Sequence, residues 1–190
     1  MHFILDCDDV LLDWQRGFRK WLAATHNLCP DPHGPASWSL SDWLGVPGPD
    51  CLALISEFNA SPSFGQLEAF PEARAAIPLL KANGHQLTVL TSCSEEPATI
   101  LRRKENLGRV FGGAIDRLLC LPLGESKAHW LNVLRTGIWI EDNYRNAVMG
   151  LNAGNKTFMM RRRHNRDDEI QSDRRITWID DWRPVISLFA

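Results

Sequence analysis

The sequence predicts an α/β fold in which a doubly wound parallel sheet carries helices on both faces, giving three layers. Short apolar runs alternate along the chain with longer amphipathic segments of helical spacing. Several of these runs are apolar nearly throughout, as is typical of strands buried on both faces. Such an alternation favours parallel strands joined by helical crossovers. One stretch, residues 14–70, interrupts the alternation and is expected to lie outside the sheet.

Several short runs of the sequence have the pattern of buried strands. Each is a short, mainly apolar run, and several end in a carboxylate or a hydroxyl. Five are expected, at His2–Asp6, Gln86–Thr91, Arg117–Leu121, Gly137–Asp142 and Lys156–Met160.

Helices are expected between these strands. The segment 71–83 opens with a proline in the first turn and stops before Gly84, although Pro78 has to be accommodated by a kink. The segment 95–107 is expected to end at Gly108 in the same way. Two further helices, at Glu125–Arg135 and Tyr144–Asn152, complete the alternation, and a terminal helix follows Asp180-Asp181.

The interrupting stretch predicts a small helical cap inserted after the first strand. Amphipathic segments at Trp14–Thr25 and Asp50–Asn59 are joined by loops rich in proline and glycine. We therefore expect a catalytic core formed by residues 1–13 and 71–190 and a cap, or substrate lid, formed by residues 14–70.

Composition limits the classes of partner and compartment. A net charge of −2 over 190 residues gives no general attraction to a nucleic-acid polymer, so a small anionic ligand fits better. No apolar run approaches the roughly 18 residues of a membrane span. The five cysteines contain no C-x-x-C pair, which favours the reducing cytoplasm.

Reactive side chains follow the predicted strands. Asp6-Cys7-Asp8-Asp9 ends the first, Thr91-Ser92 the second and Glu141-Asp142 the fourth, and Lys127 opens the helix after the third. Carboxyl ends of parallel strands meet at one edge of a sheet, where open α/β sheets bind ligands. Carboxylates packed there would repel one another unless a cation holds them together, and hard oxygen ligands favour Mg2+. The set predicts a metal and a phosphoryl group.

Four segments resemble, in order, the motifs of the haloacid dehalogenase superfamily: Phe3–Val10, Leu87–Thr91, Lys127 and Ile138–Asp142. The one departure is Asp9, where glycine is commonest, and aspartate tolerates unusual turn conformations. The resemblance implies the Rossmann-like core of that superfamily and a Mg2+-dependent phosphomonoester hydrolase.

The resemblance also implies a role for each residue. Asp6 is the nucleophile that forms an aspartyl phosphate, and Asp8 protonates the leaving alcohol and then activates water. Asp6, Asp142 and the backbone carbonyl of Asp8 would hold Mg2+, with Glu141 outside the direct ligands. Phosphoryl oxygens would be bound by Thr91, Ser92 and Lys127, of which Thr91 and Lys127 count among the catalytic residues.

Within the superfamily, the chain resembles the 5'(3')-deoxyribonucleotidases, through Asp13-Trp14, Gly17-Phe18 and Thr91-Ser92. The resemblance implies a deoxynucleoside monophosphate as substrate, stacked between aromatic side chains of the cap. Residues 13–70 carry three basic and six acidic residues, which suits a base better than a sugar phosphate, because a sugar phosphate would need more basic groups in the cap. The candidates for the stacking are Trp14, Trp38, Phe58 and Phe64, which could instead pack a core.

Other interpretations remain open. The chain could be a phosphatase of the same superfamily acting on a non-nucleotide metabolite, or a non-catalytic module that binds phosphate or nucleotide. A dehalogenase is disfavoured because such enzymes need neither Mg2+ nor the second aspartate, Asp8. Arginines between 161 and 175 alternate with acidic residues, which favours a salt-bridged loop, and no histidine pair has metal-ligand spacing. Oligomeric state is left open, a homodimer being one option.

Overall fold

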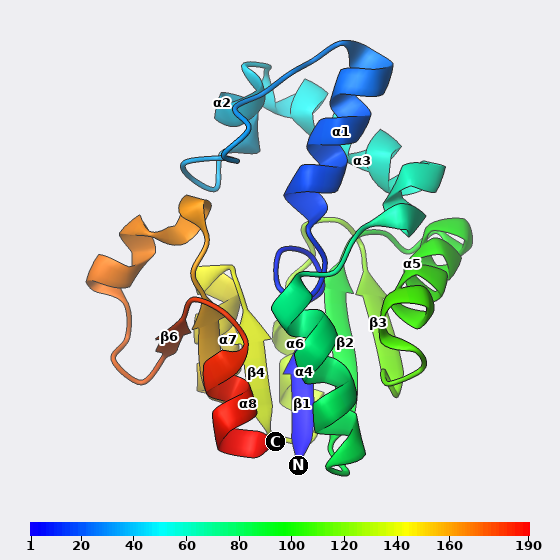
Figure 1. Cartoon of the computed structure of the whole chain (residues 1–190). Coiled ribbons are helices and arrows are strands. Elements are labelled where there is room, and N and C mark those ends of the chain that lie inside the picture. The colour runs from blue at the N-terminus through cyan, green and yellow to red at the C-terminus, as the bar shows by residue number, and fades with distance from the viewer.

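The computed structural model describes residues 1–190 and confirms the α/β fold with a parallel sheet (Figure 1). The six strands run in the order β3-β2-β1-β4-β5-β6, and every neighbouring pair is parallel. The order reverses at β1, which lies between β2 and β4, so the switch point of the sheet lies at the end of β1. The strands are β1 His2–Leu5, β2 Gln86–Ser92, β3 Arg117–Leu121, β4 Ile138–Glu141, β5 Lys156–Met160 and β6 Thr177–Ile179.

Helices cover both faces of the sheet, as alternating strand residues require. Phe3 and Leu5 of β1 pack in the cluster that includes α4, α5 and α8, whereas Ile4 faces a second cluster with Leu131 of α6 and Trp139. The helices are α4 Pro71–Ala82, α5 Pro97–Phe111, α6 Ala128–Val133, α7 Tyr144–Asn152 and α8 Arg183–Phe189.

Residues 14–70, which we call the cap, lie over the carboxyl ends of the strands (Figure 1). The Asp13 side chain starts the first cap helix by accepting a hydrogen bond from the Arg16 amide, at 3.1 Å. The elements of the cap are α1 Trp14–His26, α2 Leu40–Leu44, α3 Gly48–Ala60 and the 3-10 turn η1 Pro62–Gln66.

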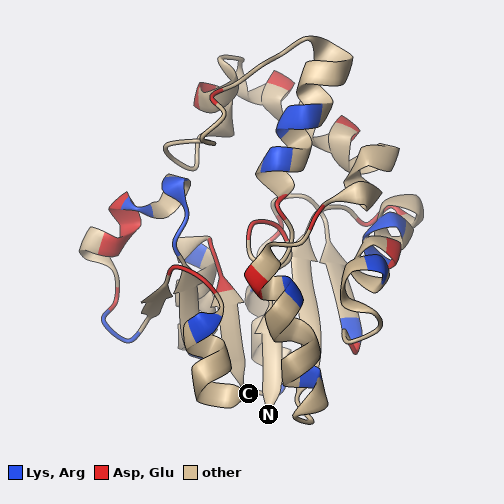
Figure 2. Cartoon of the chain, viewed as in Figure 1, with Lys and Arg blue, Asp and Glu red and all other residues tan.

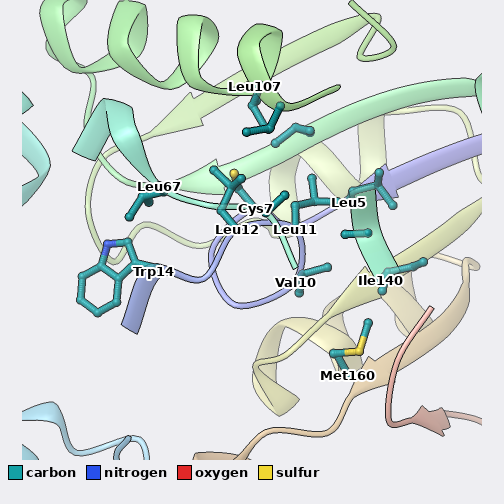
Figure 3. Close-up of a cluster of buried hydrophobic side chains, with 14 of the residues drawn as sticks. Leu5, Cys7, Val10, Leu11, Leu12, Trp14, Leu67, Leu107, Ile140 and Met160 are labelled. Carbon is teal, nitrogen blue, oxygen red and sulfur yellow. The ribbon is translucent and has the colours of Figure 1, made fainter. Parts of the chain in front are cut away.

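The cap and the sheet share one hydrophobic core. A single cluster of 35 buried residues runs from β1 and β4 into the cap, where it includes Phe18 and Phe58. The loop after β1 joins the two parts: Figure 3 shows Cys7, Leu11 and Leu12 in the same cluster as Leu5 and Trp14. The cap therefore owes part of its stability to the sheet below it.

Several sequence-based predictions were wrong in detail. The helix expected to end at Gly108 continues to Phe111, because Val110 and Phe111 extend its buried face, and it ends at Gly112 with φ 60°. The helix predicted from 125 to 135 is shorter, at 128–133. Strand β6 was not predicted, since three residues give too short a pattern to detect.

No helix has both the length and the apolar composition that crossing a bilayer requires. All five cysteines are free, and three of them, Cys7, Cys51 and Cys93, are buried.

Candidate active site

The predicted residues meet at the switch point. They line one cavity of about 660 Å³ between the sheet and the cap. Figure 2 shows acidic segments on the loops at this level, where the strands end below the cap. The residues brought together are Asp6, Asp8, Thr91, Ser92, Lys127, Glu141 and Asp142. The strand-end pattern therefore predicted which of these side chains the fold brings together.

Lys127 is the only lysine in this cavity and it joins two carboxylates. Its Nζ lies 2.6 Å from Asp6 Oδ1 and 2.8 Å from Glu141 Oε2, and its side chain is 3% exposed. Burial alone would lower the pKa of Lys127, but the two carboxylates raise it above the ordinary value. The ammonium therefore stays charged and fixes Asp6 at the end of β1.

The single charge of Lys127 balances only one of the two carboxylates that it contacts. Burial and then the neighbouring Glu141 raise the pKa of Asp6 well above its ordinary value, although Lys127 opposes this. One ammonium thus does not neutralise the acids around it, and a further cation would stabilise the ionised carboxylates.

The acids differ in how their oxygens are used. One oxygen of Glu141 accepts from Lys127, and the other accepts from the backbone amides of Asp142 and Asn143, at 3.1 and 3.0 Å. Oxygens of Asp6, Glu141 and Asp142 lie within 4.8 Å of one another. Because Glu141 is fully engaged, Asp6 and Asp142 are the carboxylates available to a cation. Hard oxygen donors with excess negative charge fit Mg2+.

Asp9 adopts the left-handed conformation, with φ 59°. This is the position where glycine was expected, and the conformation explains why, since few residues tolerate a positive φ. Its side chain accepts from the amide of Gln15 in α1, at 3.3 Å. Burial and the neighbouring Asp142 raise the pKa of Asp9 to about 8.

Arg103 contacts Asp8, which was not predicted from the sequence. One guanidinium nitrogen donates to both carboxylate oxygens of Asp8, at 2.6 and 2.8 Å, and Arg103 is fully buried. A signal existed, because Thr99, Arg103 and Asn106 put polar side chains on the buried face of α5.

His164 is a second residue that sequence reasoning missed. Its Nε2 lies 2.9 Å from Asp142 Oδ2, and its Nδ1 is hydrogen-bonded with the side chain of Gln15, at 2.9 Å. Burial alone would lower the pKa of His164, but the carboxylates of Asp142 and Asp9 raise it. No local pattern marks this histidine, because its partners are distant in the sequence.

The four cap aromatics fall into two groups. Trp14 and Trp38 line the cavity. The indole of Trp14 donates to Asn59 Oδ1 at 3.2 Å, and Trp38 is 44% exposed with its ring centroid 4.5 Å from that of His164. Phe58 and Phe64 are fully buried in the shared core and do not line the cavity.

The arginine-rich segment is largely paired within the chain. Arg161 contacts Glu169 and Arg175 contacts Asp173, each with a closest distance of 2.6 Å. Arg162 stacks on Phe70 at 4.3 Å and donates to the Asp9 carbonyl at 2.7 Å. These contacts agree with a salt-bridged loop rather than a free basic surface.

No protein-family profile matches the chain, and no curated protein matches its sequence. Solved structures do match it over nearly its whole length. A haloacid dehalogenase-like family hydrolase from Streptococcus pneumoniae superposes with a TM-score of 0.67 at 12% identity, covering 100% of this chain and 98% of that one.

Two other matches show the range of proteins with this fold. A dehalogenase in an intermediate complex gives a TM-score of 0.68 at 12% identity, covering 100% of this chain and 96% of that one. A D,D-heptose 1,7-bisphosphate phosphatase from B. bronchiseptica, complexed with magnesium and phosphate, gives 0.61 at 14% identity, covering 98% and 96%. At this identity the similarity establishes the haloacid dehalogenase-like fold alone, because proteins with one fold can carry different activities.

Proposed function

We propose that the protein is a Mg2+-dependent phosphomonoester hydrolase that works through a phosphorylated Asp6. One observation carries the proposal: Asp6 is held by Lys127 at the end of β1, and Asp8, two residues further on, faces the same cavity. A fixed nucleophile and a second carboxylic acid beside it are the two groups that such a reaction needs.

The chemistry divides between these two side chains. A carboxylate oxygen of Asp6 attacks phosphorus, and the bond from phosphorus to the alcohol oxygen breaks. Asp8 gives its proton to that oxygen, and in the second step it takes a proton from the water that hydrolyses the aspartyl phosphate. Asp8 is 23% exposed, so it can reach substrate and water, whereas Asp6 is nearly enclosed.

The metal would be held by Asp6, Asp142 and the backbone carbonyl of Asp8. When bound, Mg2+ offsets the negative charge of the phosphoryl group and of the carboxylates. Glu141 would orient Lys127 rather than bind the ion, since both of its oxygens already accept hydrogen bonds. His164, 2.9 Å from Asp142, would hold that carboxylate in place.

Phosphoryl oxygens would be bound by Lys127, Thr91 and Ser92. Thr91 is 1% exposed at the end of β2 and lines the cavity. The Ser92 hydroxyl donates to the carbonyl of Glu125 at 3.0 Å, so Thr91 is the better donor of a hydroxyl hydrogen bond.

The fold alone does not separate a phosphatase from a dehalogenase, because both occur among the structural matches. Asp8 separates them. Displacing halide needs no acid to protonate the leaving group, whereas an alcohol leaves poorly without one. The buried carboxylates, which favour a metal, point the same way.

Within this activity, we propose a deoxynucleoside monophosphate as the substrate. The cavity of about 660 Å³ is of the size of small-molecule sites, and Trp14 and Trp38 give it two aromatic walls on which a base could stack. Phe58 and Phe64 are left out, because neither lines the cavity. A non-nucleotide phosphate ester is the second candidate, since one match is named a heptose bisphosphate phosphatase.

Phosphate release from a panel of esters tests the proposal. Deoxynucleoside and ribonucleoside monophosphates, sugar phosphates and an aryl phosphate are compared with Mg2+, with chelator and with the Asp6→Asn variant. We expect Mg2+-dependent release from deoxynucleotides and a loss of more than about 1,000-fold in Asp6→Asn. Release from other esters alone would support the proposed mechanism and refute the proposal that the substrate is a nucleotide. Binding of phosphate without any release would indicate a binding module.

A further inference from the structure

Arg103 holds an unusual position for a charged residue. It belongs to α5 and is 0% exposed, and one of its nitrogens donates to both oxygens of Asp8. Its Nε and its other terminal nitrogen have no hydrogen-bond partner. The guanidinium carbon lies 4.0 Å from the ring centroid of Phe64 in η1. The side chain is thus held between a core carboxylate and a cap aromatic.

Stability does not account for this arrangement. A buried ion pair rarely repays the cost of taking both charges out of water, and here two of the guanidinium nitrogens gain no hydrogen bond in return. An apolar side chain of similar volume could fill the same space beside Phe64. Asp8 is the only carboxylate that the guanidinium pairs with. The effect of Arg103 on Asp8 is therefore what explains an arginine at this position.

The two buried cations serve different acids. Lys127 contacts Asp6 and Glu141, whereas Arg103 contacts Asp8. Arg103 does not line the cavity, although Asp8 does. The guanidinium therefore holds the Asp8 carboxylate from the protein side and leaves its other side facing the cavity, where the leaving group of a substrate would lie.

Helix α5 also fixes the end of the cap. Asn106 and Arg109 both donate to the carbonyl of Leu67, at 2.9 and 3.0 Å. Phe64, which stacks on Arg103, belongs to the adjoining turn η1. A single helix thus holds Asp8 and the last segment of the cap in a fixed relation to each other.

We propose that Arg103 is a positioning residue that orients Asp8 toward the leaving-group oxygen. Its stacking on Phe64 fixes the position of Asp8 relative to the cap. This inference rests on the proposed phosphatase activity. In the step concerned, Asp8 gives its proton to the departing oxygen while Asp6 forms the new bond to phosphorus. Misplacing Asp8 should therefore lower kcat/KM, which reports the steps up to departure of the leaving group, only for substrates whose leaving group needs a proton.

The test compares two leaving groups in Arg103→Met. The value of kcat/KM is measured for an alkyl phosphate, which needs the proton, and for 2,4-dinitrophenyl phosphate, which does not. We expect a loss of about 100-fold for the alkyl ester and of less than about 5-fold for the dinitrophenyl ester. Arg103→Lys, which keeps the charge and loses the planar group, is expected to lose about 10-fold on the alkyl ester alone.

Arg109→Met is the matched control. It removes a contact between the same helix and the same cap segment without touching Asp8, so both esters should change by the same small factor. Equal losses on both esters in Arg103→Met, or no loss, would overturn the inference. If that variant does not fold, equal losses in Arg103→Lys would do so. Failure of the unaltered protein to release phosphate from these two esters and from every other ester of the panel would instead refute the proposed phosphatase activity.

Discussion

The floor and the roof of the cavity are built in different ways. The floor is formed at the strand ends by Asp6, Lys127, Glu141 and Asp142, whose side chains are buried and in polar contact with one another or with neighbouring groups. The roof is the cap, whose aromatic rings mostly pack on one another, as Phe18 and Phe58 do with ring centroids 5.2 Å apart. The floor is a network of charges, and the roof is a small hydrophobic assembly.

The difference determines what each region can reveal about function. Buried charges cost free energy, so a cluster of them on the floor needs an explanation in chemistry. Buried aromatics in the roof need no such explanation, because they stabilise the fold wherever they lie. The floor therefore constrains the reaction more closely than the roof constrains the substrate.

Removing the floor's ammonium is the strongest test of this contrast. Lys127→Met would leave Asp6 and Glu141 buried without a counter-charge, at a cost of roughly 3–5 kcal/mol in unfolding free energy. It would also lower kcat/KM for phosphate esters by about 100- to 1,000-fold. Urea denaturation with chelator and phosphate-release assays measure the two effects. Added Mg2+ should restore part of the stability, because it offsets the same charge.

Lys81→Met provides the control for that variant. Lys81 pairs with Asp116 near the surface, where the two side chains are 39% and 33% exposed. Its loss should cost less than about 1 kcal/mol and leave kcat/KM unchanged. If Lys127→Met were no more costly than Lys81→Met, the buried charges of the floor would not depend on Lys127 for their stability.

Two substitutions distinguish the aromatic residues of the roof that pack the core from those that face the cavity. Phe58→Ala removes a fully buried ring from the shared core and should cost about 3–5 kcal/mol in unfolding free energy. In the folded fraction the substrate KM should change little. Trp38→Ala should do the reverse. We expect a KM about 10-fold higher for a deoxynucleotide, with a change in stability below about 1 kcal/mol, because the indole is 44% exposed at the cavity.

Chemical denaturation and steady-state kinetics on both variants give the answer. An unchanged KM in Trp38→Ala would mean that the exposed indole does not touch the substrate. A raised KM in Phe58→Ala, in protein shown to be folded, would mean that the packing of the roof shapes the site.

The same contrast explains what the sequence could predict. Asp6, Thr91 and Asp142 were predicted because strand ends converge at one edge of a parallel sheet, so a one-dimensional pattern fixes a three-dimensional neighbourhood. Arg103 and His164 reach the site from a helix and a loop, and their contacts with Asp8 and Asp142 depend on packing between distant segments.

Between floor and roof stands Asp9, which gives the smallest predicted effect. Its pKa is raised to about 8 by burial and by Asp142, against an ordinary value of 3.8. The folded, metal-free protein therefore keeps a proton that the unfolded chain releases, and its stability should fall as the pH rises from about 4 to 8. Asn tolerates the positive φ at this position and has no proton to lose.

Asp9→Asn should accordingly raise the unfolding free energy of the metal-free protein by about 1–2 kcal/mol at pH 8.5, and by somewhat less than half as much at pH 5.5, because the unfolded chain has already released its proton there. The hydrogen bond from the Gln15 amide can remain, because the Asn side chain keeps an acceptor oxygen. Urea denaturation with chelator at both pH values measures the difference. A gain of the same size at both pH values would mean that the backbone conformation causes the gain. The contribution from the charge of Asp9 changes with pH, whereas the contribution from the backbone does not. At pH 8.5, Mg2+ should reduce the difference in unfolding free energy between the variant and the unaltered protein, since a bound cation offsets the repulsion that the substitution removes.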